Sequence, residues 1–206
     1  MRLSVENLAC ERGERRIFEG VSFTLEPGDA LMVRGRNGAG KSSLLEILAG
    51  RLIPAAGRVL LRDAGERSLP ECLHYVGHRD ALKAALTAGE NLVFARDFLG
   101  DPALAPPEAL AAIGLAHALH LPVAYLSAGQ RRRVALARLL VAERPLWLLD
   151  EPSTALDSAS QEILRLLIEA HREAGGIVIA TTHAPLALAG AQELTIERTP
   201  VLEATS

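Results

Sequence analysis

Gly35-Arg36-Asn37-Gly38-Ala39-Gly40-Lys41-Ser42 separates a short apolar segment, residues 30–33, from a segment of helical character, residues 42–49. This spacing of glycines before Lys-Ser is the phosphate-binding loop pattern, which is specific when a strand precedes it and a helix follows it. In such a loop the backbone N–H groups surround the β-phosphate, Lys41 reaches the β- and γ-phosphates, and Ser42 binds Mg²⁺. The alternative is a chance glycine turn, but the flanking segments favour a nucleotide-phosphate site in an α/β fold.

An apolar run that ends in two acids, Leu146-Trp147-Leu148-Leu149-Asp150-Glu151, follows later in the chain. An uninterrupted apolar run is typical of a strand in a parallel sheet whose two faces are both covered. At the end of this strand we expect Asp150 to bind Mg²⁺, directly or through water, and Glu151 to act as the general base that polarises the attacking water. The alternative is that both acids only cap the next helix.

Between these two segments lies Leu126-Ser127-Ala128-Gly129-Gln130-Arg131-Arg132-Arg133. Ser127 followed three residues later by Gln130 predicts a capping box, and the helix after it is expected to run from Arg131 to about Val141. A capped helix start presents free N–H groups and a partial positive charge, which suit a terminal phosphate. The alternative is an ordinary capped surface helix.

Three other residues are candidates for contacts with the nucleotide. His183 follows the apolar segment 177–182 and would hydrogen-bond the γ-phosphate and hold the attacking water in line with Glu151; the alternative is a histidine with only a structural role. His78 follows Tyr75-Val76-Gly77, where it would sense the γ-phosphate, although a loop histidine without a role is an equal alternative. Asp157 ends the turn Ser153-Thr154-Ala155-Leu156-Asp157, and its alternative role is a simple helix cap.

The rest of the chain alternates predicted strands and helices. Residues 79–125 are rich in Ala and Leu, are broken by three prolines, and are expected to be mostly helical. Strands are predicted at 3–8, 17–25, 30–33, 58–61, 73–78, 146–149 and 177–182, and helices at 42–49, 131–141 and 158–174, followed by a loose edge strand and tail. This order predicts a parallel α/β sheet in a single domain, residues 1–206, with a helical lobe of about 79–142 inserted in it.

Composition limits the function classes. The 206 residues are 49% hydrophobic and 23% charged with a net charge of −3, so the chain lacks the basic surface that nucleic-acid binding requires. No apolar run reaches 18 residues, so we expect no membrane span, and any membrane role would need partner subunits. Cys10 and Cys72 lack metal-ligand spacing and are predicted to be free thiols of a cytosolic protein.

As a set, these segments resemble the nucleotide-binding subunits of ABC transporters over roughly residues 3–190. The matching motifs are Walker A at 35–42, the signature at 126–130, Walker B at 146–151, the D-loop at 154–157 and the switch histidine at 183. The resemblance implies a P-loop NTPase (RecA-like) parallel-sheet core, an N-terminal antiparallel β subdomain and a small inserted α-helical subdomain. It also implies a head-to-tail homodimer that encloses two ATP molecules with Mg²⁺.

The resemblance assigns roles to individual residues. In the implied dimer, Ser127 and Gly129 of one subunit face the γ-phosphate that Lys41 of the other subunit binds. Catalysis is implied for Lys41, Glu151 and His183, and metal binding for Ser42 and Asp150. Nucleotide contacts are implied for Arg12, Gly35, Arg36, Asn37, Gly38, Ala39, Gly40, Lys41, Ser42, Ser43, His78, Ser127, Gly129, Gln130 and Asp157.

Four departures from the common pattern narrow the resemblance: Ala128 replaces a glycine, His78 replaces a glutamine, Arg12 stands near the position of the aromatic residue that stacks on adenine, and the helical lobe is short. In these features the chain resembles the ATP-binding subunit of the haem exporter of cytochrome c maturation. The guanidinium group of Arg12 would then stack on the adenine, with Phe18 as the alternative.

This narrower resemblance implies ATP hydrolysis coupled to haem handling or to release of the haem-loaded chaperone. It also implies integral membrane subunits as partners and a peripheral position on the cytoplasmic face of the bacterial inner membrane. The alternatives are the ATPase of another small exporter, a soluble ABC protein without a transport role, and an unrelated phosphate-loop kinase. An unrelated kinase would not explain the signature segment at 126–130. Soluble ABC proteins usually carry two nucleotide-binding domains in one chain or a long insertion.

Overall fold

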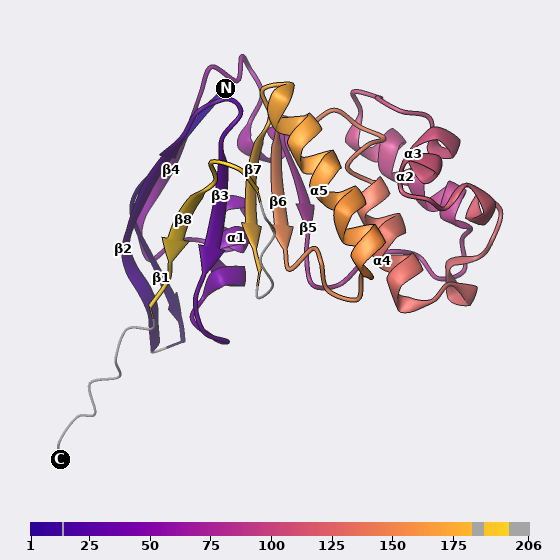
Figure 1. Cartoon of the computed structure of the whole chain (residues 1–206). Coiled ribbons are helices and arrows are strands. Elements are labelled where there is room, and N and C mark those ends of the chain that lie inside the picture. Colours follow the sequence, from indigo (N-terminus) through magenta and orange to yellow (C-terminus); the bar gives the residue numbers. More distant parts are fainter. Residues whose placement is uncertain (14, 183–187, 198–206) are drawn as a thin grey trace.

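The computed structural model describes residues 1–13, 15–182 and 188–197 as two sheets and a set of helices (Figure 1). An antiparallel sheet has the order β2-β1-β4, in which two long strands, β1 (Arg2–Arg12) and β2 (Arg15–Leu25), pair with each other and β1 also pairs with β4 (Ala56–Arg62). This confirms the antiparallel N-terminal part of the predicted fold.

The central sheet is parallel and has the order β5-β6-β7-β3-β8. Its three inner strands are buried on both faces over almost their whole length, as the apolar runs predict. The strands are β3 (Ala30–Arg34), β5 (Leu73–Val76), β6 (Leu146–Asp150), β7 (Ile177–Thr181) and β8 (Gln192–Thr195). The predicted edge strand near the C-terminus is therefore confirmed as β8.

Two helices cover opposite faces of this sheet (Figure 1). Along β6, Leu146 and Leu148 pack in the core that contains the leucines of α1 (Lys41–Leu48), together with the antiparallel sheet. Trp147 and Leu149 point the other way, into the core that contains Leu164 and Ile168 of α5 (Ser158–Glu173). The alternation of side chains along a strand thus divides the apolar residues between two cores.

A third core holds the helices between β5 and β6, which lie at the end of the molecule farthest from the antiparallel sheet in Figure 1. We call them the lobe helices: α2 (Ala88–Leu99), α3 (Pro106–Ala112) and α4 (Ala128–Ala137). Short 3-10 turns at Ala116–Ala118 and Val123–Tyr125 lie between α3 and α4, and a third, Leu69–Cys72, directly precedes β5. Cys10 and Cys72 are buried free thiols, as predicted.

The structure corrects three predicted boundaries. The helix expected at 131–141 begins at Ala128 and ends at Ala137. It begins earlier because the capping box satisfies backbone N–H groups of the first turn. It ends earlier because the backbone then forms a tighter turn, in which the Leu140 N–H donates to the Ala137 carbonyl. The strand expected at 73–78 ends at Val76. Residues 79–87 are not helical, and the side chain of Asn91 hydrogen-bonds Lys83, Leu86 and Thr87 and so holds residues 83–87 as a loop.

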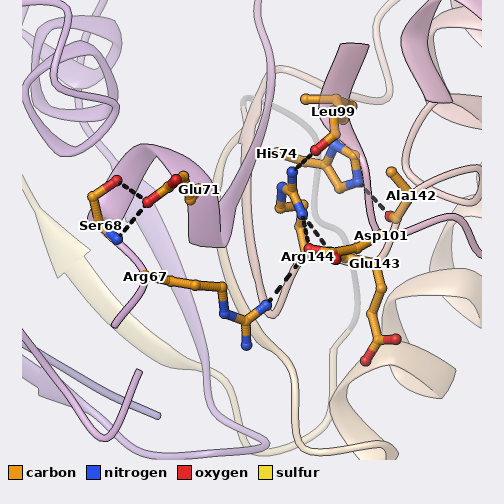
Figure 2. Close-up of polar contacts among 9 residues, drawn as sticks. All are labelled: Arg67, Ser68, Glu71, His74, Leu99, Asp101, Ala142, Glu143 and Arg144. Carbon is orange, nitrogen blue, oxygen red and sulfur yellow. Dashed lines mark hydrogen bonds and ion pairs between the residues drawn. The ribbon is translucent and has the colours of Figure 1, made fainter. Parts of the chain in front are cut away.

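Arg144 ties the lobe helices to the central sheet (Figure 2). Its side chain is 5% exposed and its Nη1 donates to Asp101 Oδ2 at 2.9 Å and to the Glu143 carbonyl at 3.0 Å. The guanidinium group also contacts the carbonyl of Leu99, the last residue of α2. A cation at this end of a helix satisfies an orphan carbonyl and complements the helix dipole, so Arg144 fixes where α2 ends relative to β6.

Two histidines, His74, which is buried, and His171, which is partly buried, lie on the same side of the sheet as Trp147. In β5, His74 Nε2–H donates to the Ala142 carbonyl at 2.8 Å (Figure 2). On α5, His171 stacks on Trp147 with ring centroids 3.9 Å apart and an interplanar angle of 10°. Burial lowers the pKa of His74 to about 4, and burial likewise lowers the pKa of His171 to about 4. Both side chains are therefore neutral in the folded protein at neutral pH.

We expect the protein to lose stability as the pH falls below about 6.5, the pKa of an unperturbed histidine. Below that pH the unfolded chain binds protons that the folded chain binds only near pH 4. By linkage this should lower the free energy of unfolding by on the order of 2 kcal/mol for each histidine between pH 7 and pH 5. Urea unfolding at the two pH values measures the difference.

Matched glutamine variants identify the source of this pH dependence. His74→Gln and His171→Gln should each remove about half of it, whereas His117→Gln, which changes an exposed histidine of the lobe, should leave it intact. An equal pH dependence in all three variants would contradict the assignment.

Candidate functional site

The predicted nucleotide-binding segments meet at one edge of the central sheet. Strands β3, β7, β6 and β5 are neighbours and run parallel, so their carboxyl ends lie together. The chain segments that leave these ends are the glycine loop, Thr182, Asp150-Glu151 and Gly77-His78. Ligands of open parallel sheets bind at this edge.

The glycine loop leaves β3 and curls around the first residue of α1. Lys41 is 6% exposed, and its Nζ donates to the carbonyls of Gly35 at 2.9 Å and Arg36 at 3.4 Å. Gly40 has φ +107°, and a Cβ at this position would lie 2.4 Å from Cγ2 of Ile17. Only glycine fits there, because both the backbone conformation and the close packing exclude a side chain.

Two hollows that share Ser42 flank this loop. The first, of about 300 Å³, brings together the glycine loop and Glu151; its lining is Ile17, Asn37, Gly38, Gly40, Lys41, Ser42, Ser43 and Glu151. The second, of about 400 Å³, is lined in part by Ser42, Tyr75, His78 and Asp150. The structure therefore places the predicted phosphate ligands, the two acids and His78 around one helix start.

Thr181 orients both acids, and the sequence prediction missed it. The Thr181 hydroxyl donates to Asp150 Oδ1 at 2.7 Å, and the backbone N–H of Glu151 donates to the same hydroxyl at 3.0 Å. Asp150 is 3% exposed, and Thr181 is fully buried. A polar residue at the end of the apolar strand 177–181 is the signal that could have revealed it.

The oxygen atoms at this edge fit a magnesium ion. The hydroxyl of Ser42 and the carboxylate of Asp150 line the same hollow, and hard oxygen donors of this kind are what Mg²⁺ prefers, with phosphate and water completing its shell. Nearby, burial and the Asp150 carboxylate raise the pKa of Tyr75 to about 12, so its phenol stays neutral. Arg51 lies over the Tyr75 ring at 4.2 Å from its centroid.

The signature segment forms the predicted capping box. The N–H of Gln130 donates to the Ser127 hydroxyl at 3.2 Å, and the Gln130 side chain accepts from the Ser127 N–H at 2.8 Å. Gly129 packs so closely on the turn before α5 that a Cβ would lie 2.8 Å from the Ala155 carbonyl. Ser127, Gly129 and Gln130 line neither hollow, so the structure does not bring them to the glycine loop of the same chain.

The remaining candidate residues do not line either hollow, or they lie outside the described residues. Asp157 caps α5 by accepting from the Ser160 N–H at 2.8 Å, and hydrogen bonding from Ser160 lowers the pKa of this carboxyl. Arg12 forms an ion pair with Glu46 of α1, while Phe18 is 2% exposed and does not offer its ring at the surface. His183 lies outside the described residues.

Comparison with known proteins agrees with this geometry. A family profile described as ABC transporter matches residues 18–154. Solved structures that resemble the chain include an ATP binding subunit of an ABC transporter, with 24% identity, a TM-score of 0.78, and coverage of 89% of this chain and 80% of that one. They also include the dimeric post-hydrolysis structure of the ATP-binding cassette MJ0796 bound to ADP and Pi, with 26% identity, a TM-score of 0.74 and coverage of 88% of each chain.

Similar curated proteins carry a more specific name. The cytochrome c biogenesis ATP-binding export protein CcmA of Bradyrhizobium diazoefficiens is 54% identical over 190 residues, which cover 91% of this chain and 94% of the relative. The CcmA protein of Nitrobacter winogradskyi is 53% identical over 197 residues, covering 95% and 98%. The chain therefore belongs to the ABC transporter family, as an ATP-binding subunit that resembles CcmA.

Proposed function

We propose that this ATPase is the energy-supplying subunit of the haem exporter of cytochrome c maturation. Nucleotide binding and ATP hydrolysis follow from its family. The observation that carries the narrower proposal is the 54% identity, over 91% of the chain, to a cytochrome c biogenesis ATP-binding export protein. Hydrolysis would drive haem handling or release of the haem-loaded chaperone by the complex.

The geometry of the two hollows supports a role for the polar groups that line them. The loop amides and Lys41 would hold the phosphates, and Ser42 and Asp150 would hold Mg²⁺, which neutralises charge on the phosphate oxygens. Glu151 would accept a proton from the attacking water as its oxygen bonds to the γ-phosphorus. The bond from that phosphorus to the bridging oxygen breaks, giving ADP and phosphate, while His183 would orient the γ-phosphate.

The signature segment would act on a second copy of the chain. Ser127 and Gly129 lie away from the two hollows of their own chain, which supports a role at the nucleotide held by Lys41 of a partner subunit. The MJ0796 cassette, which is 26% identical, is itself a dimer bound to ADP and Pi. We therefore propose a homodimer that encloses two ATP molecules.

We further propose that the chain is one nucleotide-binding domain with a lobe of about residues 79–142. The lobe helices share their own core between β5 and β6, which supports these limits. Integral membrane subunits of the exporter would be the partners, at the cytoplasmic face of the inner membrane. In the described residues, none of the helices has the length and hydropathy needed to cross a bilayer.

We expect Glu151→Gln to convert the protein into a stable ATP-bound dimer. Glutamine keeps the shape of the side chain but cannot accept the proton, so the ATPase kcat should fall by roughly 10²- to 10⁴-fold while Mg-ATP still binds. Size-exclusion chromatography with light scattering should then show twice the monomer mass when ATP is present.

Adding Ser127→Arg to this variant is the control for the interface. The double variant should bind ATP and stay monomeric, because a bulky cation replaces the hydroxyl that faces the partner's phosphate. Persistence of the dimer would contradict the role of the signature segment. Failure of Glu151→Gln alone to bind ATP would contradict the nucleotide site itself.

Thr181→Val should weaken the Mg²⁺ dependence of hydrolysis with little effect on the fold. Valine has nearly the same shape but removes the 2.7 Å hydrogen bond that orients Asp150. Loss of such a supporting contact typically lowers metal affinity about 10- to 100-fold, so the Mg²⁺ concentration for half-maximal ATPase activity should rise. Thr181→Ser should restore the wild-type value, and an unchanged Mg²⁺ requirement in Thr181→Val would refute the role of Thr181.

A further inference from the structure

Arg132, one turn into α4, is buried among the hydrolytic groups, although the sequence places it in an arginine-rich segment. It is 4% exposed. Its Nη2 donates to the carbonyls of Asp150 and Glu151, both at 2.9 Å, and its Nε donates to that of Pro152 at 3.2 Å. The guanidinium group thus holds three consecutive carbonyls at and just beyond the end of β6.

The same side chain also holds the loop that carries His78. Nη1 donates to the Gly77 carbonyl at 2.8 Å and pairs with Asp80 Oδ1 at 3.3 Å. These two residues flank His78 and Arg79 on both sides. One buried arginine therefore connects three segments that are far apart in sequence: α4, the end of β6 and the loop after β5.

The contact with Glu151 involves a strained backbone. Glu151 has φ +48°, a left-handed conformation that is unfavourable for a residue with a side chain. The N–H of Glu151 is held by Thr181 and its carbonyl by Arg132, so the two contacts fix the peptide groups on both sides of its Cα. Rotation of either peptide group would change where the carboxylate points.

We propose that Arg132 is a positioning residue for ATP hydrolysis, which makes the orientation of Glu151 depend on the position of α4. This inference rests on the proposed function. In the proposed dimer, Ser127 and Gly129 at the start of α4 engage the nucleotide of the partner subunit, while Arg132 on the same helix holds Glu151 of its own chain. ATP bound by the partner would thereby favour hydrolysis in this chain and make the two sites cooperative.

Shape as well as charge is needed for this role. The planar guanidinium group has five N–H donors in a fixed fork and serves five acceptors here. Lysine keeps the charge but concentrates its three donors at one point, so it cannot reach both Gly77 and Pro152 in the same way. Arg132→Lys therefore separates positioning from the presence of a buried cation.

The test compares steady-state ATPase kinetics of full-length wild type and Arg132→Lys, at protein concentrations that allow dimerisation. We expect kcat to fall at least about 10-fold with a KM for ATP within about 2-fold, because ground-state binding is retained and only alignment is lost. The Hill coefficient for ATP should fall from near 2 to about 1. A residue that only stabilises the fold would move neither the ratio of kcat to KM nor the Hill coefficient once the protein is folded.

Arg133→Gln is the matched control. Arg133 is the next residue on α4, and its Nη1 donates to the carbonyls of Ile113 and Gly114 at 3.3 and 3.5 Å, which belong to the lobe alone. This variant should keep kcat and the Hill coefficient even where it lowers the melting temperature. If Arg132→Lys does not fold, Asp80→Asn, which changes a partly exposed acceptor, should reduce kcat about 3-fold at unchanged KM.

The outcomes separate this inference from the proposed function. A wild-type protein that hydrolyses ATP cooperatively, with Arg132→Lys matching it in kcat and Hill coefficient, would overturn the role of Arg132 and leave the ATPase assignment in place. A wild-type protein that neither binds nor hydrolyses ATP would overturn both. A fall in kcat and Hill coefficient in Arg132→Lys but not in Arg133→Gln would support the inference.

Discussion

Coverage of both faces of the central parallel sheet is the constraint on which the site depends. Because α1 and α5 bury the two faces, polar side chains cannot lie along the inner strands and are found only where those strands end. Parallel pairing then brings the ends of β3, β5, β6 and β7 to one edge. The glycine loop, Asp150, Glu151 and His78 are neighbours for this reason, although more than a hundred residues separate the first from the acids.

What could be predicted from the sequence is what depends on local chemistry. The phosphate loop, the Ser127–Gln130 capping box and the acidic strand end each consist of residues within a short stretch of sequence, so each pattern can be read locally. The predicted parallel α/β core was confirmed because continuous apolar runs indicate strands that are buried on both faces. The antiparallel sheet, which the resemblance to ABC transporter subunits implied, was also confirmed.

What could not be predicted depends on contacts between distant segments. Thr181 meets Asp150 across two strands, and Arg144 meets the end of α2 across 45 residues, so neither pairing has a local pattern. The three arginines at 131–133 look equivalent in the sequence, yet Arg132 alone of them is buried, because helical periodicity turns it toward the sheet. The predicted helix boundaries were wrong for a similar reason. Hydrogen bonds from the side chain of Asn91, and not helix propensity, keep residues 83–87 out of α2.

Division of the proposed site between two chains has a thermodynamic consequence. In the proposed dimer, the free energy that joins the two subunits would come from the nucleotides between them, so the fraction of complete sites would depend on subunit concentration as well as on ATP. A dilute, isolated subunit would bind ATP through its glycine loop but hydrolyse it poorly. The proposed partner subunits, by holding two copies side by side, would raise the effective concentration of the chain and remove this limit. Hydrolysis would then be confined to assembled complexes, which can use the free energy of ATP hydrolysis.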